Sequence, residues 1–247
     1  MNGYGRGFFA LPPVVKNIIM LNVIMLLANY AAKAALGIDL NTILGLYFPK
    51  SEQFMPVQII THIFMHGDFL HLLLNMYALF IFGQVLESTW GPKKFLLYYL
   101  VCGIGAAITH ETVIAFQYSA IASNLDSDSL SMVLEEGTDW FRRGQPLPGN
   151  EMLKLQMLLN TPTVGASGAV FGILLAFGVM FPNTQLMLLI PPMPIKAKYF
   201  VIMYGAIELY SAITQPGSNI AHAAHLGGML FGYIMIRYWK KTTNYFY

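Results

Sequence analysis

Long apolar segments dominate this sequence and limit its fold more than any other feature. A helix needs roughly 20 mostly apolar residues to cross a bilayer. Only 11% of the 247 residues are charged, whereas a typical soluble domain has about 25%. The sequence therefore predicts an all-α polytopic membrane protein with a single membrane domain and six transmembrane helices, at about 17–35, 69–88, 94–115, 165–181, 197–214 and 221–238.

Polar and proline-rich segments divide this domain. A long polar insert at about 116–162 separates the third and fourth spans, and its segment 130–143 is expected to form a short surface helix. The string Pro146-Leu147-Pro148-Gly149 ends that helix, and Pro191-Pro192-Met193-Pro194 interrupts the chain before the fifth span. The absence of an internal repeat argues against an inverted-repeat transporter.

The two ends of the chain are expected to lie outside the membrane domain, which covers 17–238. Residues 1–16 and 239–247 are then short terminal segments. Arg6 and Lys16 precede the first apolar run, whose alanine-rich end weakly resembles a signal-peptide cleavage site. The length of the charged region and of the apolar run favours a membrane span instead.

Loop charges predict the orientation of the spans, because lysine and arginine are enriched in cytoplasmic loops. With both termini inside, the outer loops hold Lys33, Lys50, Arg142, Arg143 and Lys154. The inner flanks hold the larger set of Arg6, Lys16, Lys93, Lys94, Lys196, Lys198, Arg237, Lys240 and Lys241. Most of the acidic residues lie in the predicted outer loops, namely Asp126, Asp128, Glu135, Glu136, Asp139 and Glu151. We therefore predict an N-in, C-in topology.

Ser167 and His225 are polar residues inside predicted spans. Ionisable residues in a membrane segment indicate a functional site, and a serine becomes nucleophilic when a base takes its proton. In the predicted topology, spans two, four and six run in the same direction. Ser167, His225, His71 and Asn75 then lie at a similar depth near the outer face. We interpret Ser167 and His225 as a catalytic dyad.

Neighbouring residues fit the same chemistry. Small residues at four-residue spacing allow helices to approach closely, and both spans carry them, at Gly168 and Gly172 and at Ala224, Gly228 and Gly232. Backbone N–H groups at the start of a helix lack intrahelical partners. Those of Ala166 and Ser167, with His71 and Asn75 on one helix face, are candidate oxyanion donors. Phe171, one turn after Ser167, is a candidate stacking partner for His225.

Other polar residues leave alternatives open. No acid is obviously placed to orient His225, which favours a dyad over a triad. Glu208 is expected either to form a hydrogen bond inside the bundle or to belong to a proton path, and Glu87 to cap or pair at the inner end of span two. His222 lines the cavity or rivals His225 as the base. Gly165-Ala166-Ser167-Gly168 alone also fits simple helix packing.

Several classes of site are not expected. His62 and His66 are four residues apart and could clamp a metal, but no H-E-x-x-H motif accompanies them. His66 more simply stabilises its loop or lies at the membrane interface. The single cysteine, Cys102, excludes a disulfide framework, and no basic block indicates nucleic-acid binding. We expect no metal and no cofactor.

These motifs resemble those of the rhomboid intramembrane serine proteases. The resemblance is carried by His66-Gly-Asp-Phe-Leu-His71-Leu-Leu-Leu-Asn75-Met76, by Gly165-Ala-Ser167-Gly168 and by Ala224-His225-Leu-Gly-Gly228. It implies a six-helix bundle, with Ser167 as nucleophile and His225 as base. It also implies His71, Asn75 and the Ser167 backbone as oxyanion donors, a water-filled cavity open to the outside, and gating by span five and a capping loop near 215–220. Glu87 matches a family glutamate at the end of span two.

The sequence also departs from the family. Phe171 stands where some bacterial members carry a tyrosine, no Trp-Arg motif is evident in the loop between spans one and two, and the insert at 116–162 is longer than in the simplest members. We expect an endopeptidase that cuts transmembrane segments of other membrane proteins at or near the outer boundary of the lipid bilayer. The alternatives are a pseudoenzyme that binds membrane clients and a small transporter. We expect a bacterial inner membrane, since no organelle-targeting segment is visible. The natural substrate and the oligomeric state stay open.

Overall fold

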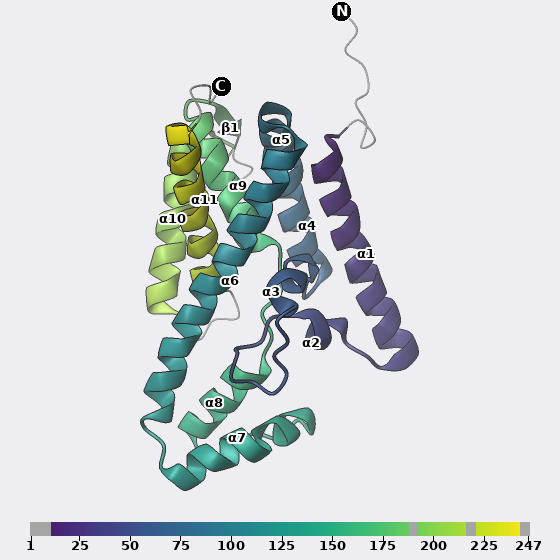
Figure 1. Ribbon diagram of the computed structural model, residues 1–247, viewed down its shortest axis with the longest axis vertical. Coiled ribbons are helices and arrows are strands. Elements are labelled where there is room, and N and C mark those ends of the chain that lie inside the picture. Colours follow the sequence, from purple (N-terminus) through teal and green to yellow (C-terminus); the bar gives the residue numbers. More distant parts are fainter. Residues whose placement is uncertain (1–10, 188–191, 216–220, 243–247) are drawn as a thin grey trace, which may run out of the picture.

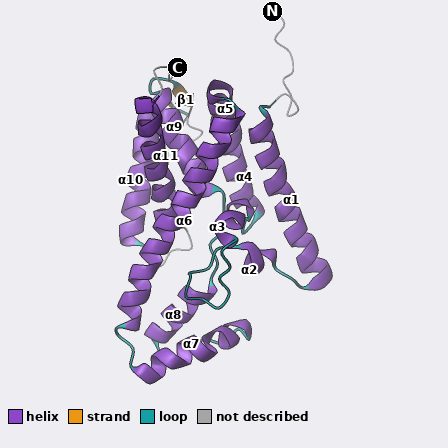
Figure 2. Ribbon diagram, viewed as in Figure 1, coloured by secondary structure: helices purple, strands orange, loops and turns teal. Residues whose placement is uncertain are grey.

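The protein is mostly helical in its computed structural model, which describes residues 11–187, 192–215 and 221–242. Residues 1–10 and 243–247, and most of the expected capping loop near 215–220, lie outside the described residues. Figure 2 shows helices throughout the bundle. The α-helices are α1 (Pro13–Leu36), α2 (Leu40–Leu44), α3 (Gln58–Thr61), α4 (Phe69–Ala78), α5 (Gln84–Trp90), α6 (Pro92–Ala122), α7 (Ser127–Arg142), α8 (Asn150–Asn160), α9 (Ser167–Met180), α10 (Ala197–Thr214) and α11 (His222–Thr242). A 3-10 turn (His62–Phe64), a π-helical turn (Leu79–Gly83) and an antiparallel strand pair, β1 (Gln185–Met187) with β2 (Pro194–Lys196), complete the described elements.

The long helices form one bundle, in which α4 and α5 join through the π-helical turn into a single rod. Figure 1 places the start of α1 and the end of α11 at the same end of the bundle, with α7 and α8 at the other end. Among the described residues, three helical segments are long and apolar enough to cross a membrane, namely Pro13–Leu36, Phe69–Trp90 and Pro92–Ala122, and α9 is a shorter apolar helix. The all-α membrane fold predicted from the sequence is therefore confirmed.

Large apolar side chains on the outside of the bundle fit a lipid environment. Leu27 and Leu74 are about 60% exposed, and Ile202 and Tyr210 still more so. Contiguous apolar surface of this kind is rare on soluble monomers, but it costs nothing against acyl chains. The protein is an integral, multi-pass membrane protein.

Glycines allow the inner helices α6, α9 and α11 to pack closely. A methyl group on Gly228 of α11 would overlap the carbonyl of Gly168 on α9. One on Gly172 would overlap the thiol of Cys102 on α6, and the hydroxyl of Tyr98 donates to the Gly172 carbonyl at 2.8 Å. The small-residue spacing predicted to bring spans four and six together therefore lies at their contact.

Glu87 is buried in the middle of α5 and caps a different helix. Its two carboxylate oxygens accept the backbone N–H groups of Val14 and Val15, at 2.9 and 2.7 Å. These N–H groups belong to the first turn of α1 and have no partners within that helix. The predicted capping role of Glu87 is thus present, and the helix it caps is α1.

The insert differs in part from the prediction. Helix α6 continues to Ala122, so 116–122 is helical and does not belong to a polar loop. The predicted surface helix is present as α7, but α8 was not predicted. The buried amide of Gln156 on α8 bonds the Gly137 carbonyl and the Leu147 N–H group, each at 3.0 Å. This amide joins α7 and α8 into a small unit with its own apolar cluster, a tertiary contact that spacing in the sequence does not reveal.

We predict that Gly228→Ala destabilises the bundle, because the added methyl group meets a backbone carbonyl that cannot move aside. Overpacking costs about 1–3 kcal/mol, so the thermal unfolding midpoint in detergent should fall. Gly137→Ala is the matched control, since its methyl group would lie 3.5 Å from Leu147 in ordinary contact. Equal midpoints for the two variants would contradict this account of the packing.

Candidate active site

Ser167 and His225 meet where α9 and α11 begin. Ser167 is the first residue of α9, and His225 lies one turn into α11. The imidazole Nε2 of His225 is 2.8 Å from the hydroxyl oxygen of Ser167. The two residues are 58 positions apart in the chain and meet because Gly168 and Gly228 let the helix backbones touch. The pair predicted from the sequence is therefore within hydrogen-bond distance.

The turn before α9 brings Ser167 to the histidines of the preceding segments. Gly165 has a φ of 134°, which favours glycine, and its N–H group donates to the His62 carbonyl at 3.0 Å. A methyl group on Gly165 would lie 2.9 Å from the ring of His71 and 3.6 Å from the Ser167 hydroxyl. Ala166 is the N-cap and makes no side-chain cap. The turn therefore brings the backbone just before Ser167 against the ring of His71.

His71 and Asn75 share one face of α4, as their spacing predicts. Asp68 caps this helix, and its carboxylate accepts the His71 N–H group at 2.8 Å. The amide Nδ2 of buried Asn75 lies 3.3 Å from Nε2 of His66, whose ring packs edge-on against His71 at 5.0 Å. His66 thus orients the candidate oxyanion donor Asn75, a role that the sequence did not indicate.

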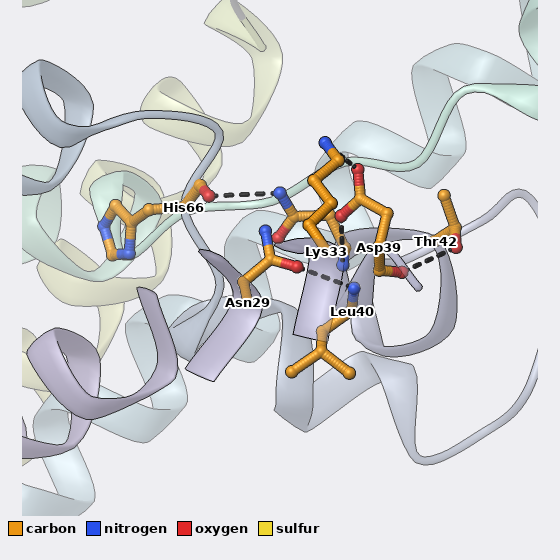
Figure 3. Close-up of polar contacts among 7 residues, drawn as sticks. Asn29, Lys33, Asp39, Leu40, Thr42 and His66 are labelled. Atoms are coloured by element: carbon orange, nitrogen blue, oxygen red, sulfur yellow. Dashed lines mark hydrogen bonds and ion pairs between the residues drawn. The ribbon is translucent and has the colours of Figure 1, made fainter. Parts of the chain in front are cut away.

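A polar network holds the loop that carries His66 (Figure 3). The His66 carbonyl accepts the side-chain amide of Asn41 at 3.1 Å. Asp39 pairs with Lys33 at 2.6 Å and caps the short helix α2, and Asn29 of α1 accepts the Leu40 N–H group at 2.7 Å. The end of α1 is therefore tied through α2 to the residues beside the site.

Phe171 lies flat against His225. The ring centroids are 4.2 Å apart and the planes differ by 7°. Stacking of this kind restricts how the imidazole plane tilts, and it needs the aromatic face but no hydroxyl group. The stacking geometry expected for Phe171 is present.

The expectation that no acid is placed to orient His225 is wrong. The Oε2 atom of Glu208, on α10, lies 2.9 Å from Nδ1 of His225 and 2.6 Å from Nδ1 of His222. The bond to His222 is aligned, whereas Oε2 lies off the direction of the His225 Nδ1–H bond. Spacing in the sequence did not reveal the contact, because it depends on how α10 is rotated against α11. His222 binds Glu208, and His225 is the histidine bonded to Ser167.

The histidines are not grouped as the metal hypothesis required. Nδ1 of His62 is 2.8 Å from the Gln58 carbonyl, and Nε2 of His66 faces Asn75. Within residues 11–187, 192–215 and 221–242, ligand atoms gather only at Glu208, His222 and His225, all within 4.8 Å of one another. Two histidines and a carboxylate can hold zinc. In the structure, the Nδ1 atoms of both histidines instead face the Glu208 oxygen.

A cavity of about 20 Å³ lies beside Ser167. His62, His110 and Thr163 supply polar walls, and most of the remaining lining comes from glycines and alanines of α6, α9 and α11. The Thr163 hydroxyl and His110 Nε2 are 2.9 Å apart at its edge. A space of this size holds one water molecule.

We predict that acid destabilises the fold through His66. Burial, with a smaller contribution from His71, lowers the pKa of His66 from 6.5 to about 3. The folded state therefore keeps this ring neutral, so its stabilising contribution is complete above pH 6.5 and is lost as the pH falls toward 3. The loss is up to about 3 kcal/mol at pH 4. When the pH falls from 7 to 4, the unfolding midpoint in detergent should fall less for His66→Gln than for the wild type. An unchanged difference would assign the acid sensitivity to other groups.

Comparison with known proteins agrees with the geometry. The family model described as "Rhomboid domain" matches residues 53–241 of this chain. Rhomboid protein 1, mitochondrial, of Saccharomyces cerevisiae is 28% identical over 76% of this chain and 43% of its own length. RHOMBOID-like protein 12, mitochondrial, of Arabidopsis thaliana is 30% identical over 69% of this chain and 42% of its own length. Rhomboid protease AarA of Providencia stuartii is 27% identical over 73% of this chain and 57% of its own length. This chain thus matches about half the length of these relatives. Because the match covers most of the chain and every helix that contributes to the Ser167 site, the chain belongs to the rhomboid family.

Proposed function

We propose that this protein is an intramembrane serine endopeptidase that cleaves transmembrane segments of other membrane proteins through Ser167 and His225. The observation that carries the proposal is the 2.8 Å contact between His225 Nε2 and the Ser167 hydroxyl inside an apolar bundle. Family membership supports the reaction class, and the Providencia relative is named a protease. Substrates enter from the lipid bilayer, and the chemistry requires neither a cofactor nor nucleic acid.

The proposed reaction is acyl transfer. The Ser167 oxygen attacks the scissile carbonyl carbon while its proton passes to His225 Nε2, and the imidazolium then protonates the leaving amine. The Ser167 N–H group and the side chains of His71 and Asn75 donate to the oxyanion, with the backbone at Ala166 completing the turn. Water then hydrolyses the acyl-enzyme by the same steps in reverse, and the cavity beside Ser167 has room for one such molecule.

We also propose the full topology of six spans, with both termini inside. The start of α1 and the end of α11 lie at one end of the bundle (Figure 1), and this end carries Lys93, Lys94, Lys240 and Lys241 at the ends of α6 and α11. The positive charges assign it to the cytoplasm. A bacterial inner membrane remains our proposal for the compartment; the Providencia relative favours it, and the two mitochondrial relatives do not.

Two other functions make different predictions. A pseudoenzyme would bind membrane clients without cutting them, and would have no need of a base within hydrogen-bond distance of Ser167. A transporter would use Glu208 in a proton path, but this carboxylate faces two histidines beside Ser167. Covalent labelling by a fluorophosphonate, which reacts with an activated serine, separates the protease from both.

We expect Ser167→Ala and His225→Ala each to lower cleavage of a fluorogenic transmembrane substrate on the order of 10⁴-fold or more. The assay uses purified protein in detergent with a chelator present, so that metal-dependent cleavage does not contribute. Thermal unfolding midpoints of the variants serve as the control for folding. If either folded alanine variant cleaved the substrate at the wild-type rate, the assignment of Ser167 and His225 as the catalytic pair would be wrong.

We expect Asn75→Ala to reduce kcat about 10²- to 10³-fold with a smaller change in KM, because an oxyanion donor acts mainly in the transition state. Asn150→Ala, at the exposed start of α8, is the matched control and should cut normally. A folded Asn75→Ala protein with normal kcat would remove Asn75 from the oxyanion site.

A further inference from the structure

Glu208 completes a continuous polar chain that ends at the candidate nucleophile. It is 8% exposed between α10 and α11. Its Oε2 atom lies 2.9 Å from Nδ1 of His225, and the opposite nitrogen of that ring, Nε2, lies 2.8 Å from the Ser167 hydroxyl. In the part of the chain that the structure describes, Nδ1 of His225 is buried and makes no aligned hydrogen bond, and the Glu208 carboxylate is the polar group facing it.

The acceptor character of a carboxylate determines the tautomer of His225. An ionised carboxylate can only accept hydrogen bonds, and a neutral imidazole has one N–H donor and one acceptor nitrogen. With Nδ1 facing Glu208, the proton belongs on Nδ1. The lone pair of Nε2 is then free to accept the proton of Ser167, as a general base requires.

We propose that Glu208 is a positioning residue that holds His225 in this Nδ1–H tautomer and stabilises the imidazolium formed during acyl transfer. The inference rests on the proposed function. In the reaction, the Ser167 proton moves to Nε2, the cationic ring keeps its Nδ1 proton directed at Glu208, and the Nε2 proton passes to the leaving amine. Glu208 stays ionised throughout, so no further reactant is needed.

His222 and Phe171 divide the remaining restraints. His222 donates to the same Glu208 oxygen at 2.6 Å, which holds the carboxylate between the two rings. Phe171 stacks on His225 and limits its tilt, but stacking cannot select a tautomer. The loose alignment of Oε2 with the His225 Nδ1–H bond is common in free enzymes, in which catalytic hydrogen bonds tighten only when substrate binds.

The position of Glu208 on α10 has a structural consequence. The triad contact joins α10 to α11, and it exists only while these helices are packed as observed. Displacing α10 from α11 would separate Glu208 from His225 and leave the base unoriented. Full activity therefore requires α10 to be packed against α11 when the Ser167 proton passes to His225.

The test compares the full-length wild type with Glu208→Gln and Glu208→Asp in detergent with chelator present. Glutamine keeps the size and can still bind His222, but it removes the charge and the acceptor-only character. We expect Glu208→Gln to lower kcat about 10²- to 10⁴-fold, in the range of the equivalent acid-to-amide change in serine protease triads, with KM little changed. Glu208→Asp should recover part of the rate. Glu151→Gln, at an exposed ion pair with Lys154, is the matched control and should cut normally.

A spectroscopic readout separates positioning from a purely structural role. Nitrogen NMR of protein labelled with ¹⁵N-histidine, assigned with His225→Ala, should report an Nδ1–H tautomer for His225 in the wild type and its loss in Glu208→Gln. An Nε2–H tautomer in the wild type would overturn the proposal even if Glu208→Gln did not fold. A folded Glu208→Gln enzyme with kcat within threefold of wild type would overturn it as well.

Failure of the proposed function itself would look different. A wild type that neither cuts substrate nor reacts with a fluorophosphonate would disprove the protease, whereas the tautomer of His225 could still be measured. If a chelator abolished the wild-type activity, and Glu208→Gln abolished it as well, the positioning role would be wrong. Glu208, His222 and His225 would then form a metal site.

Discussion

The close contact between α9 and α11 is the interaction on which the rest of the site depends. A methyl group on Gly228 would collide with the Gly168 carbonyl of α9, and one on Gly168 would collide with the side chain of Ala106 on α6. This closeness brings the first turn of α9 against the first two turns of α11, and so places Ser167 at 2.8 Å from His225. In lipid, close backbone packing is itself a source of helix association, because apolar side chains gain nothing by leaving one apolar medium for another. The same glycines therefore contribute to both stability and catalysis.

Two carboxylates in this bundle accept N–H groups that the first turn of a helix leaves without partners. Glu87 accepts the first N–H groups of α1, and Asp68 accepts that of His71 at the start of α4. Glu87 is buried, so its contacts offset a large desolvation cost, since an unpaired polar group away from water costs several kcal/mol. Asp68 is exposed and caps α4 from the surface. These contacts also set the position of α1 relative to α5 and the register of α4, on which His71 and Asn75 are mounted.

The surroundings of His225 combine an apolar restraint and a polar one. Phe171 stacks on the imidazole ring of His225 and limits its tilt, and Glu208 faces Nδ1 of that ring. A dyad held only by packing would leave both tautomers accessible, whereas an acceptor at Nδ1 favours the one that can act as a base. The ring of His66 lies beside the Asn75 amide in the same way, so His225 and Asn75 each have a polar neighbour that can orient them.

The sequence alone determined the helical membrane class, the pairing of Ser167 with His225 and the face shared by His71 and Asn75. These features follow from local rules, namely apolar length, helical spacing and the rarity of ionisable residues in membrane segments. Only the tertiary structure placed Glu208 at His225, His66 at Asn75 and α8 against α7, and extended α6 through 116–122. Those contacts depend on how one helix is rotated and set against another, and this geometry comes from the summed packing of distant residues, which no local pattern records.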